Sequence, residues 1–121
     1  MSAIAGIVRF DGQALERNVL QRMSSILAPY GRDAQDTWQS AGAGLIRTLL
    51  RTTPEDQHDR QPVALGDCQV IFVGRLDNRD ELIAQLALDP RLASHMADSE
   101  LMAQACQRWD TQALERVEGS Y

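Results

Sequence analysis

Apolar and polar residues follow one another in short stretches that predict strands separated by polar loops. Alternation with a period of two predicts a strand over residues 4–10, and a run of β-branched and aromatic residues predicts another over 69–73. An apolar run over 42–51 predicts a buried strand. The polar stretches 32–39 and 55–61 are expected to be loops, the second of them fully solvated.

Helical spacing of apolar residues predicts the other elements. Residues 14–27 carry apolar side chains three and four positions apart, and Pro29 ends that helix. A second helix opens at Asn78, which we expect to be its capping residue, and a third, capped by Asp98, runs to Trp109. The strands and helices occur in irregular order without an evident linker, which predicts a single α+β domain over residues 1–121.

Charge and composition exclude several kinds of protein. The chain has 12 basic and 17 acidic residues, a net charge of −5, and every basic residue is an arginine. Without lysine the chain cannot complete a P-loop or form a Schiff base with a pyridoxal cofactor. The acidic balance argues against nucleic-acid binding, and no apolar run approaches the roughly 20 residues that span a bilayer.

Cysteine and histidine are too sparse to predict a metal site. Cys68 and Cys106 lie 38 residues apart without a neighbouring ligand pair, and His58 and His95 are equally isolated. We expect two reduced, packed thiols in a cytoplasmic protein, with a disulfide or a reactive thiol as the alternative.

Three stretches of the sequence, in order, resemble a known family. They are residues 1–7 with Phe10-Asp11-Gly12, residues 72–82 preceded by Gln61-Pro62, and Asp98-Ser99-Glu100 with Trp109 and residues 114–121. This succession resembles the N-terminal glutaminase domain of glutamine-hydrolysing asparagine synthetases, which belongs to the N-terminal-nucleophile (Ntn) amidotransferases. The resemblance implies an αββα sandwich of antiparallel sheets flanked by helices.

At the reaction centre the chain departs from this family. The family begins Met-Cys-Gly, and after removal of the methionine the cysteine attacks the glutamine amide with its own α-amine as the base, a group whose pKa is about 8. Here Ser2 takes that position, and a hydroxyl is a weaker nucleophile than a thiol. The family forms its oxyanion hole with an asparagine amide and a glycine N–H. Val73 replaces the asparagine here, so only the backbone of Gly74 remains.

The resemblance also implies residues that bind the substrate. Asp98 matches the aspartate that pairs with the substrate amine, with a purely structural role as a helix cap as the alternative. Arg47 or Arg51 matches the arginine that binds the substrate carboxylate. Arg75 stands where the family has a glutamate that helps hold the amine. Two hypotheses stay open for it: a solvent-facing charge at the end of a strand, or a residue that fills the vestigial site by pairing with Asp98.

Residues 49–55 and 75–82 look most like a subgroup, the asparagine-synthetase-like enzymes of peptide natural-product clusters. These include the ATP-dependent cyclases of lasso peptides, and β-lactam synthetases are a similar case. The resemblance implies a catalytically degenerate glutaminase domain that serves as a scaffold for a synthetase domain, with a homo-oligomer and a peptide substrate as further partners. It assigns ATP and magnesium to that second domain and no cofactor to this chain.

Two other functions stay open, and so does the extent of the domain. The chain could be an active glutamine hydrolase that uses Ser2, Gly74 and Asp98, or a free-standing binding module that shares the fold. In the family, the segment that resembles residues 118–121 runs into further core strands. We therefore expect a partial sandwich, truncated at its C-terminal end.

Overall fold

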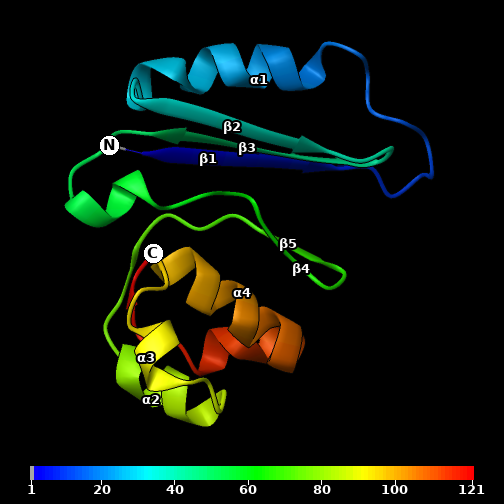
Figure 1. The fold of residues 1–121 in the computed structure, drawn as a ribbon. Helices are drawn as coiled ribbons and strands as arrows, with labels where there is room; N and C mark the ends of the chain where they lie inside the picture. Colours follow the sequence, from blue (N-terminus) through cyan, green and yellow to red (C-terminus); the bar gives the residue numbers. More distant parts are fainter. Residues whose placement is uncertain (1) are drawn as a thin grey trace. The chain divides into compact units, whose positions relative to one another are not determined.

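The computed structural model describes residues 2–121 and divides the chain into two compact units, up to Gln57 and from His58 onward (Figure 1). Each unit combines helices with antiparallel strands, which confirms the α+β class. That residues 1–121 form one domain, and that this domain is truncated, stay predictions. Among the described residues, no helix has the length and apolar character needed to cross a membrane.

The first unit is a three-stranded antiparallel sheet with one helix on it (Figure 1). Its elements are β1 (Ala3–Val8), α1 (Val19–Leu27), η1 (Ala28–Tyr30), β2 (Ala34–Gln39), β3 (Ala43–Leu49) and η2 (Pro54–Gln57). The central strand is β3, as its apolar sequence predicts, with β1 and β2 on either side. The helix packs against β3 at Gly44, where a side chain would come within 2.5 Å of Leu20.

One strand of this sheet lies where the sequence predicts a loop. Residues 32–39 are polar apart from Trp38, yet residues 34–39 form β2 at the edge of the sheet. The loop prediction is wrong because an edge strand needs few apolar residues when a partner satisfies its polar ones. Here Asp36 lies opposite Arg47 of β3, and the two side chains form an ion pair at 2.8 Å.

Two other predicted elements of this unit are shorter than expected. The first strand ends at Val8, and Phe10 is 96% exposed beyond it. The helix predicted over 14–27 begins only at Val19. Leu15 is buried nonetheless, because its N–H donates to the carbonyl of Ala41 and holds the segment against the sheet.

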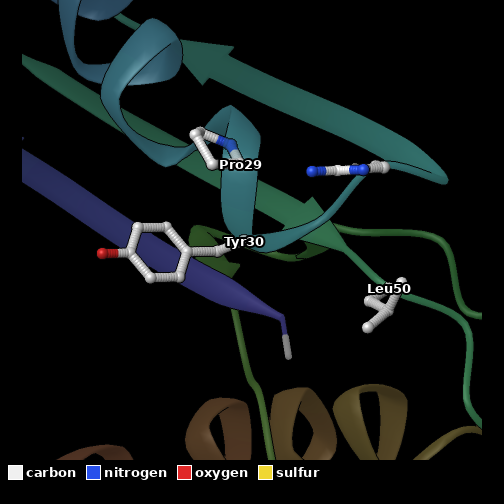
Figure 2. A pocket seen from close by; sticks show the side chains of 4 residues that line it. Pro29, Tyr30 and Leu50 are labelled. Atoms are coloured by element: carbon white, nitrogen blue, oxygen red, sulfur yellow. The ribbon is translucent and has the colours of Figure 1, made fainter.

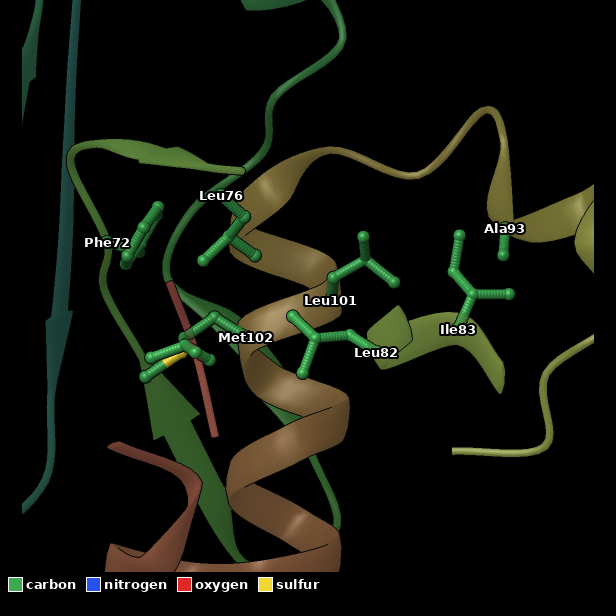
Figure 3. Close-up of a cluster of buried hydrophobic side chains, with 8 residues drawn as sticks. Phe72, Leu76, Leu82, Ile83, Ala93, Leu101 and Met102 are labelled. Carbon is green, nitrogen blue, oxygen red and sulfur yellow. The ribbon is translucent and has the colours of Figure 1, made fainter. Parts of the chain in front are cut away.

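The second unit packs helices and two short strand pairs around one apolar core (Figure 3). Its elements are β4 (Val63–Leu65), β5 (Cys68–Val70), β6 (Arg75–Leu76), α2 (Arg79–Gln85), α3 (Pro90–Ala93), α4 (Asp98–Trp109), η3 (Asp110–Glu115) and β7 (Gly119–Ser120). Leu82 of α2 and Leu101 of α4 are fully buried at its centre, and Phe72 and Leu76 pack beside them. The burial of these side chains is the main favourable term for this unit.

The strand predicted over 69–73 ends at Val70, and the loop predicted over 55–61 is not solvated throughout. Gln61 is buried, and its side-chain amide bonds both the N–H and the C=O of Phe72. The backbone around Phe72 therefore has a side chain as partner instead of a neighbouring strand, which is why the regular strand stops before it.

Both predicted helix starts of this unit are confirmed, but neither predicted cap is. Asn78 precedes α2, yet its side chain donates to the carbonyl of Arg116 and accepts from the N–H of Glu118, both at the C-terminal end of the chain. Asp98 is the first residue of α4, and it is the Glu100 carboxylate that accepts the N–H of Ala97 at the cap position, at 2.9 Å. The polar residues at these two positions are used for long-range contacts.

The pairing of β6 with β7 depends on two glycines. A side chain at Gly119 would place its first carbon 1.9 Å from the carbonyl oxygen of Arg75, and one at Gly74 would come 2.4 Å from that of Ser120. Backbone lies on the other side of each contact, so neither strand can give way locally.

We predict that Gly119→Ala lowers the free energy of unfolding by about 3 kcal/mol, because the added methyl group forces β6 and β7 apart. Urea unfolding followed by circular dichroism measures the change. Gly42→Ala is the matched control, since its added methyl group would have its nearest neighbours at 3.7 Å. Equal stability of Gly119→Ala and the control would contradict the structural role of this glycine.

Candidate functional site

Ser2, the predicted nucleophile position, lies just before β1 and is half-buried. Its hydroxyl oxygen accepts a hydrogen bond from the backbone N–H of Leu50 at 3.2 Å. Among the described residues no side-chain base contacts this hydroxyl. In this hydrogen bond the Ser2 oxygen is the acceptor, so the contact does not help to remove the hydroxyl proton. Its effect is structural, because it connects Ser2 to the residue after β3.

A surface pocket of about 410 Å³ lies at the end of β3, lined by Pro29, Tyr30, Arg32 and Leu50 (Figure 2). Its volume falls within the range of small-molecule sites in proteins. Since the N–H of Leu50 bonds the Ser2 hydroxyl, the pocket and the predicted nucleophile position share a residue. Pro29, Tyr30 and Arg32 are all exposed, so the pocket is open to solvent. The Arg32 guanidinium makes no hydrogen bond or ion pair within residues 2–121.

The turn that carries Pro29, Tyr30 and Arg32 is held tightly against β3. A side chain at Gly31 would place its first carbon 2.5 Å from the backbone nitrogen of Leu49, so only glycine permits this approach. The N–H of Asp33 donates to the carbonyl of Leu49 at 2.9 Å, and the Asp33 carboxylate accepts the N–H of Arg51 at 2.7 Å. These contacts hold the turn that carries Pro29, Tyr30 and Arg32 close to the end of β3.

Neither of the two arginines singled out from the sequence lines this pocket. Arg47 is only 2% exposed on β3, where it is paired with Asp36. Arg51 is exposed and contributes its backbone N–H to Asp33. Arg32 is the arginine of the pocket, and the sequence signal that could have indicated it is the Pro-Tyr-Gly turn directly before it.

In the second unit, Gly74 keeps the backbone group expected of an oxyanion site. It is exposed, and its N–H makes no hydrogen bond within the described part of the chain. Gln61 orients the segment two residues earlier. It donates to the carbonyl of Phe72 at 2.8 Å and accepts the N–H of Phe72 at 2.7 Å. Val73, between these groups, offers no side-chain donor.

A polar network extends from Gln61 to the start of α4. The Gln61 amide also donates to the Asp59 carboxylate at 2.8 Å, and the buried Ser99 hydroxyl donates to the other oxygen of Asp59 at 2.6 Å. The network thus connects residue 72 with α4 through hydrogen bonds of good length. The sequence gives no sign of this network, because nothing in the local pattern pairs residues 59, 61 and 99.

Asp98, the predicted amine-binding residue, has both carboxylate oxygens engaged inside its own unit. One oxygen accepts the backbone N–H of Leu76 at 2.8 Å, and the other pairs with the guanidinium of Arg79. Arg79 also donates to the carbonyls of Met96 at 2.9 Å and Ala93 at 3.4 Å. A cation of the chain itself therefore occupies the carboxylate.

The hypothesis that Arg75 pairs with Asp98 is wrong. Arg75 forms its ion pair with Asp77 at 2.7 Å, and this hydrogen bond raises the pKa of the Arg75 guanidinium above its usual value. Arg75 and Asp77 are two residues apart and both exposed, so their side chains form a local ion pair at the surface instead of the predicted pair with Asp98. Arg79, the first residue of α2, is the residue that reaches Asp98.

The two thiols and the histidines form no metal site among the described residues, since no group of three His, Cys, Asp or Glu side chains comes together there. Cys68 and Cys106 are both half-buried free thiols. Burial, and to a lesser degree the neighbouring Cys68 and Asp110, raises the pKa of the Cys106 thiol, which lowers its reactivity at neutral pH.

Comparison with protein families decides the family of this chain. A family model described as a glutamine amidotransferase domain matches residues 1–121. The chain belongs to this family of glutamine amidotransferase domains. A search of curated proteins found no match.

As a glutamine amidotransferase domain, the chain distributes its candidate residues over both units. Ser2 and the pocket with Arg32 belong to the first unit, and Gly74 and Asp98 belong to the second. Within the second unit the structure brings Asp98 together with β6 and Arg79, while Arg75 is turned to Asp77. Each unit thus keeps one recognisable part of a site.

We predict that Gln61→Leu lowers the free energy of unfolding by about 3 kcal/mol, because it leaves the N–H and C=O of Phe72 buried without partners. Gln57→Leu, at an exposed position, is the matched control and should change stability by less than about 0.5 kcal/mol. Thermal or urea unfolding of both variants measures the difference. A Gln61→Leu protein as stable as the control would contradict the role given to this side chain.

Proposed function

We propose that this glutamine amidotransferase domain does not hydrolyse glutamine. It serves instead as a scaffold for the synthetase domain of an asparagine-synthetase-like enzyme that forms amide bonds with ATP. The observation that carries the proposal is the state of Asp98. Its two oxygens bind Leu76 and Arg79, so the carboxylate that the family resemblance assigns to the substrate amine is already neutralised by the chain's own guanidinium.

A substrate ammonium at Asp98 would have to share the carboxylate with Arg79 or displace that guanidinium. That guanidinium is anchored by two backbone carbonyls as well as by Asp98, and it is held in place by its own helix. A charge-assisted pair with additional hydrogen bonds is among the stronger polar interactions in proteins. To displace Arg79, the free amino acid would have to make up for all of these contacts and also lose its own translational freedom.

The reaction centre supports the same proposal. Ser2 offers a hydroxyl whose oxygen accepts a backbone N–H, and Val73 removes one donor of the oxyanion hole. Loss of a single oxyanion donor costs about 10²–10³ in rate in enzymes that use one. Arg75 adds a positive charge where the family has a glutamate. All three departures affect glutamine hydrolysis, and together they would lower its rate strongly.

The sequence resemblance supplies the rest of the proposal. Residues 49–55 and 75–82 resemble the peptide natural-product subgroup, so we assign the chain a synthetase domain as partner, a peptide as the substrate of the whole enzyme, and a dimeric, cytoplasmic assembly. ATP and magnesium then bind the synthetase domain. The amine that attacks the activated acid would come from the peptide itself, which makes glutamine-derived ammonia unnecessary.

A second function, an active glutamine hydrolase, is favoured by one observation. Gly74 is exposed, and its N–H makes no hydrogen bond among residues 2–121, which supports a role for it as an oxyanion donor. In this alternative Ser2 is the nucleophile and its α-amine is the base, and Asp98 would have to exchange Arg79 for the substrate.

Ammonia release separates the two functions. We predict that the purified protein, with its initiator methionine removed, releases no more ammonia from glutamine than its Ser2→Ala variant does. A coupled glutamate dehydrogenase assay measures the rate, and circular dichroism confirms that both proteins are folded. Glutamine-dependent release that disappears in Ser2→Ala would establish the hydrolase and overturn the scaffold.

Restoring the family residues should not restore the reaction. We predict that the triple variant Ser2→Cys, Val73→Asn and Arg75→Glu still hydrolyses glutamine slowly, because Arg79 continues to occupy Asp98. The same assay, run beside the Ser2→Cys single variant, measures what the added oxyanion donor and glutamate contribute. Rapid hydrolysis by the triple variant would show that Asp98 is accessible to a substrate amine and would contradict the proposal.

A further inference from the structure

We propose that Cys68 and Cys106 form a reversible intramolecular disulfide bond when the protein meets a small oxidising disulfide such as oxidised glutathione. They are the two cysteines of the chain, and both are half-buried free thiols in the second unit. The bond would join β5 covalently to α4. This inference goes beyond the scaffold function and does not depend on it, because it concerns neither Ser2 nor Asp98.

The two elements that carry the thiols pack against each other. Helix α4 contacts both strands of the hairpin formed by β4 and β5. At the turn of this hairpin, a side chain at Gly66 would place its first carbon 2.6 Å from Nε2 of Gln107. Gly66 precedes Cys68 by two residues, and Gln107 directly follows Cys106. The hairpin and the helix are therefore in contact at the level of the thiols.

Both thiols lie on the faces by which these elements pack. Cys68 and Val70 are two positions apart in β5 and share one face of the strand, and Val70 packs against the apolar core of the unit. Met102 lies in this core, one helical turn before Cys106, and Cys106 packs against the same core (Figure 3). The two sulfurs are thus directed into the interface between β5 and α4.

Electrostatics gives a second sign that the thiols are neighbours. Burial is the main reason that the pKa of the Cys106 thiol is raised, and the charge of Cys68 is the next cause. Such an effect decreases with distance and needs the two groups to be close. Since the cysteines are 38 residues apart in the sequence, only the packing of β5 against α4 brings them within this range.

Two thiol–disulfide exchange steps would form the bond. We assign the first attack to Cys68, because the raised pKa of Cys106 makes that thiol the poorer nucleophile. The Cys68 thiolate attacks one sulfur of the small disulfide, breaks its S–S bond and releases one thiol molecule. The Cys106 thiolate then attacks the Cys68 sulfur and releases the second thiol. Two electrons and two protons pass from the protein thiols to the two released molecules.

The proposed bond is reversible because its sulfurs are not sealed in the core. Cys68 and Cys106 are each only half-buried, so a small thiol can attack the bond and reduce it. In a reducing compartment the pair would remain as two thiols, as expected for a cytoplasmic protein, and would close only on exposure to an oxidant.

Treatment of the reduced protein with excess oxidised glutathione tests the proposal. A chromogenic thiol reagent, applied after unfolding, counts the free thiols, and intact-mass spectrometry detects bound glutathione. We expect the count to fall from two thiols per chain to none, without bound glutathione, and dithiothreitol to restore both. On a denaturing gel without reductant the oxidised protein should migrate as a single chain.

Single serine variants are the matched controls. The Cys106→Ser variant lacks the second step, so we expect it to retain one glutathione on Cys68 after the same treatment. Circular dichroism of Cys106→Ser and Cys68→Ser confirms that both variants are folded.

Three results for the unaltered protein would overturn the proposal. They are two remaining free thiols, glutathione retained on both cysteines, and a disulfide bond between two chains. All three are independent of ammonia release from glutamine, so failure of this proposal and failure of the scaffold function can be told apart.

Discussion

The carboxylate of Asp98 joins the elements on which the second unit depends. Through Leu76 it fixes β6, and through Arg79 it fixes the start of α2 to the segment between α3 and α4. Both side chains are largely shielded from solvent, so removal of either partner would leave a charge in a poor environment. The short helices of this unit are thus oriented by one ion pair together with the apolar core, and that ion pair uses the residue that the family resemblance assigns to substrate.

Side chains replace backbone partners throughout the segment between β5 and α2. The Gln61 side chain hydrogen-bonds both the N–H and the C=O of Phe72, as a neighbouring strand would. Asn78 does the same for the C=O of Arg116 and the N–H of Glu118, just before β7. A segment held in this way can follow an irregular path while its buried polar groups stay satisfied. The N–H of Gly74 lies within it and is left without a partner among the described residues. This is the segment in which the family resemblance predicts an oxyanion site, with the N–H of Gly74 as its backbone donor and Val73 in place of the side-chain donor.

Local patterns predicted the elements whose burial is regular, and long-range polar contacts decided the others. The apolar stripe that ends at Trp109 predicts α4, and the apolar run over 42–51 predicts β3 as a buried strand. In contrast, β2 is a strand because Asp36 meets Arg47 across the sheet, and no property of residues 34–39 alone reveals that partner. Long-range contacts also decide the candidate site. The sequence indicates Asp98 as a site residue but not Arg79 as its partner. That Arg32 lines the pocket follows only from the position of its turn against β3.

The contact between Asp98 and Arg79 links the fold of this amidotransferase domain to the scaffold function proposed for it. If Asp98 served a substrate amine, β6 and α2 would lose their shared partner each time the amine bound, unless other contacts held them. In this chain Arg79 stays on Asp98 and also bonds two backbone carbonyls, so the folded state is stabilised by the contact that a substrate would have to break. Binding energy that must first displace such a contact cannot be used at the reacting atoms. In the scaffold function proposed above this contact can stay intact and stabilise the fold, whereas the alternative, a glutamine hydrolase, requires Arg79 to share Asp98 with a substrate amine or to leave it.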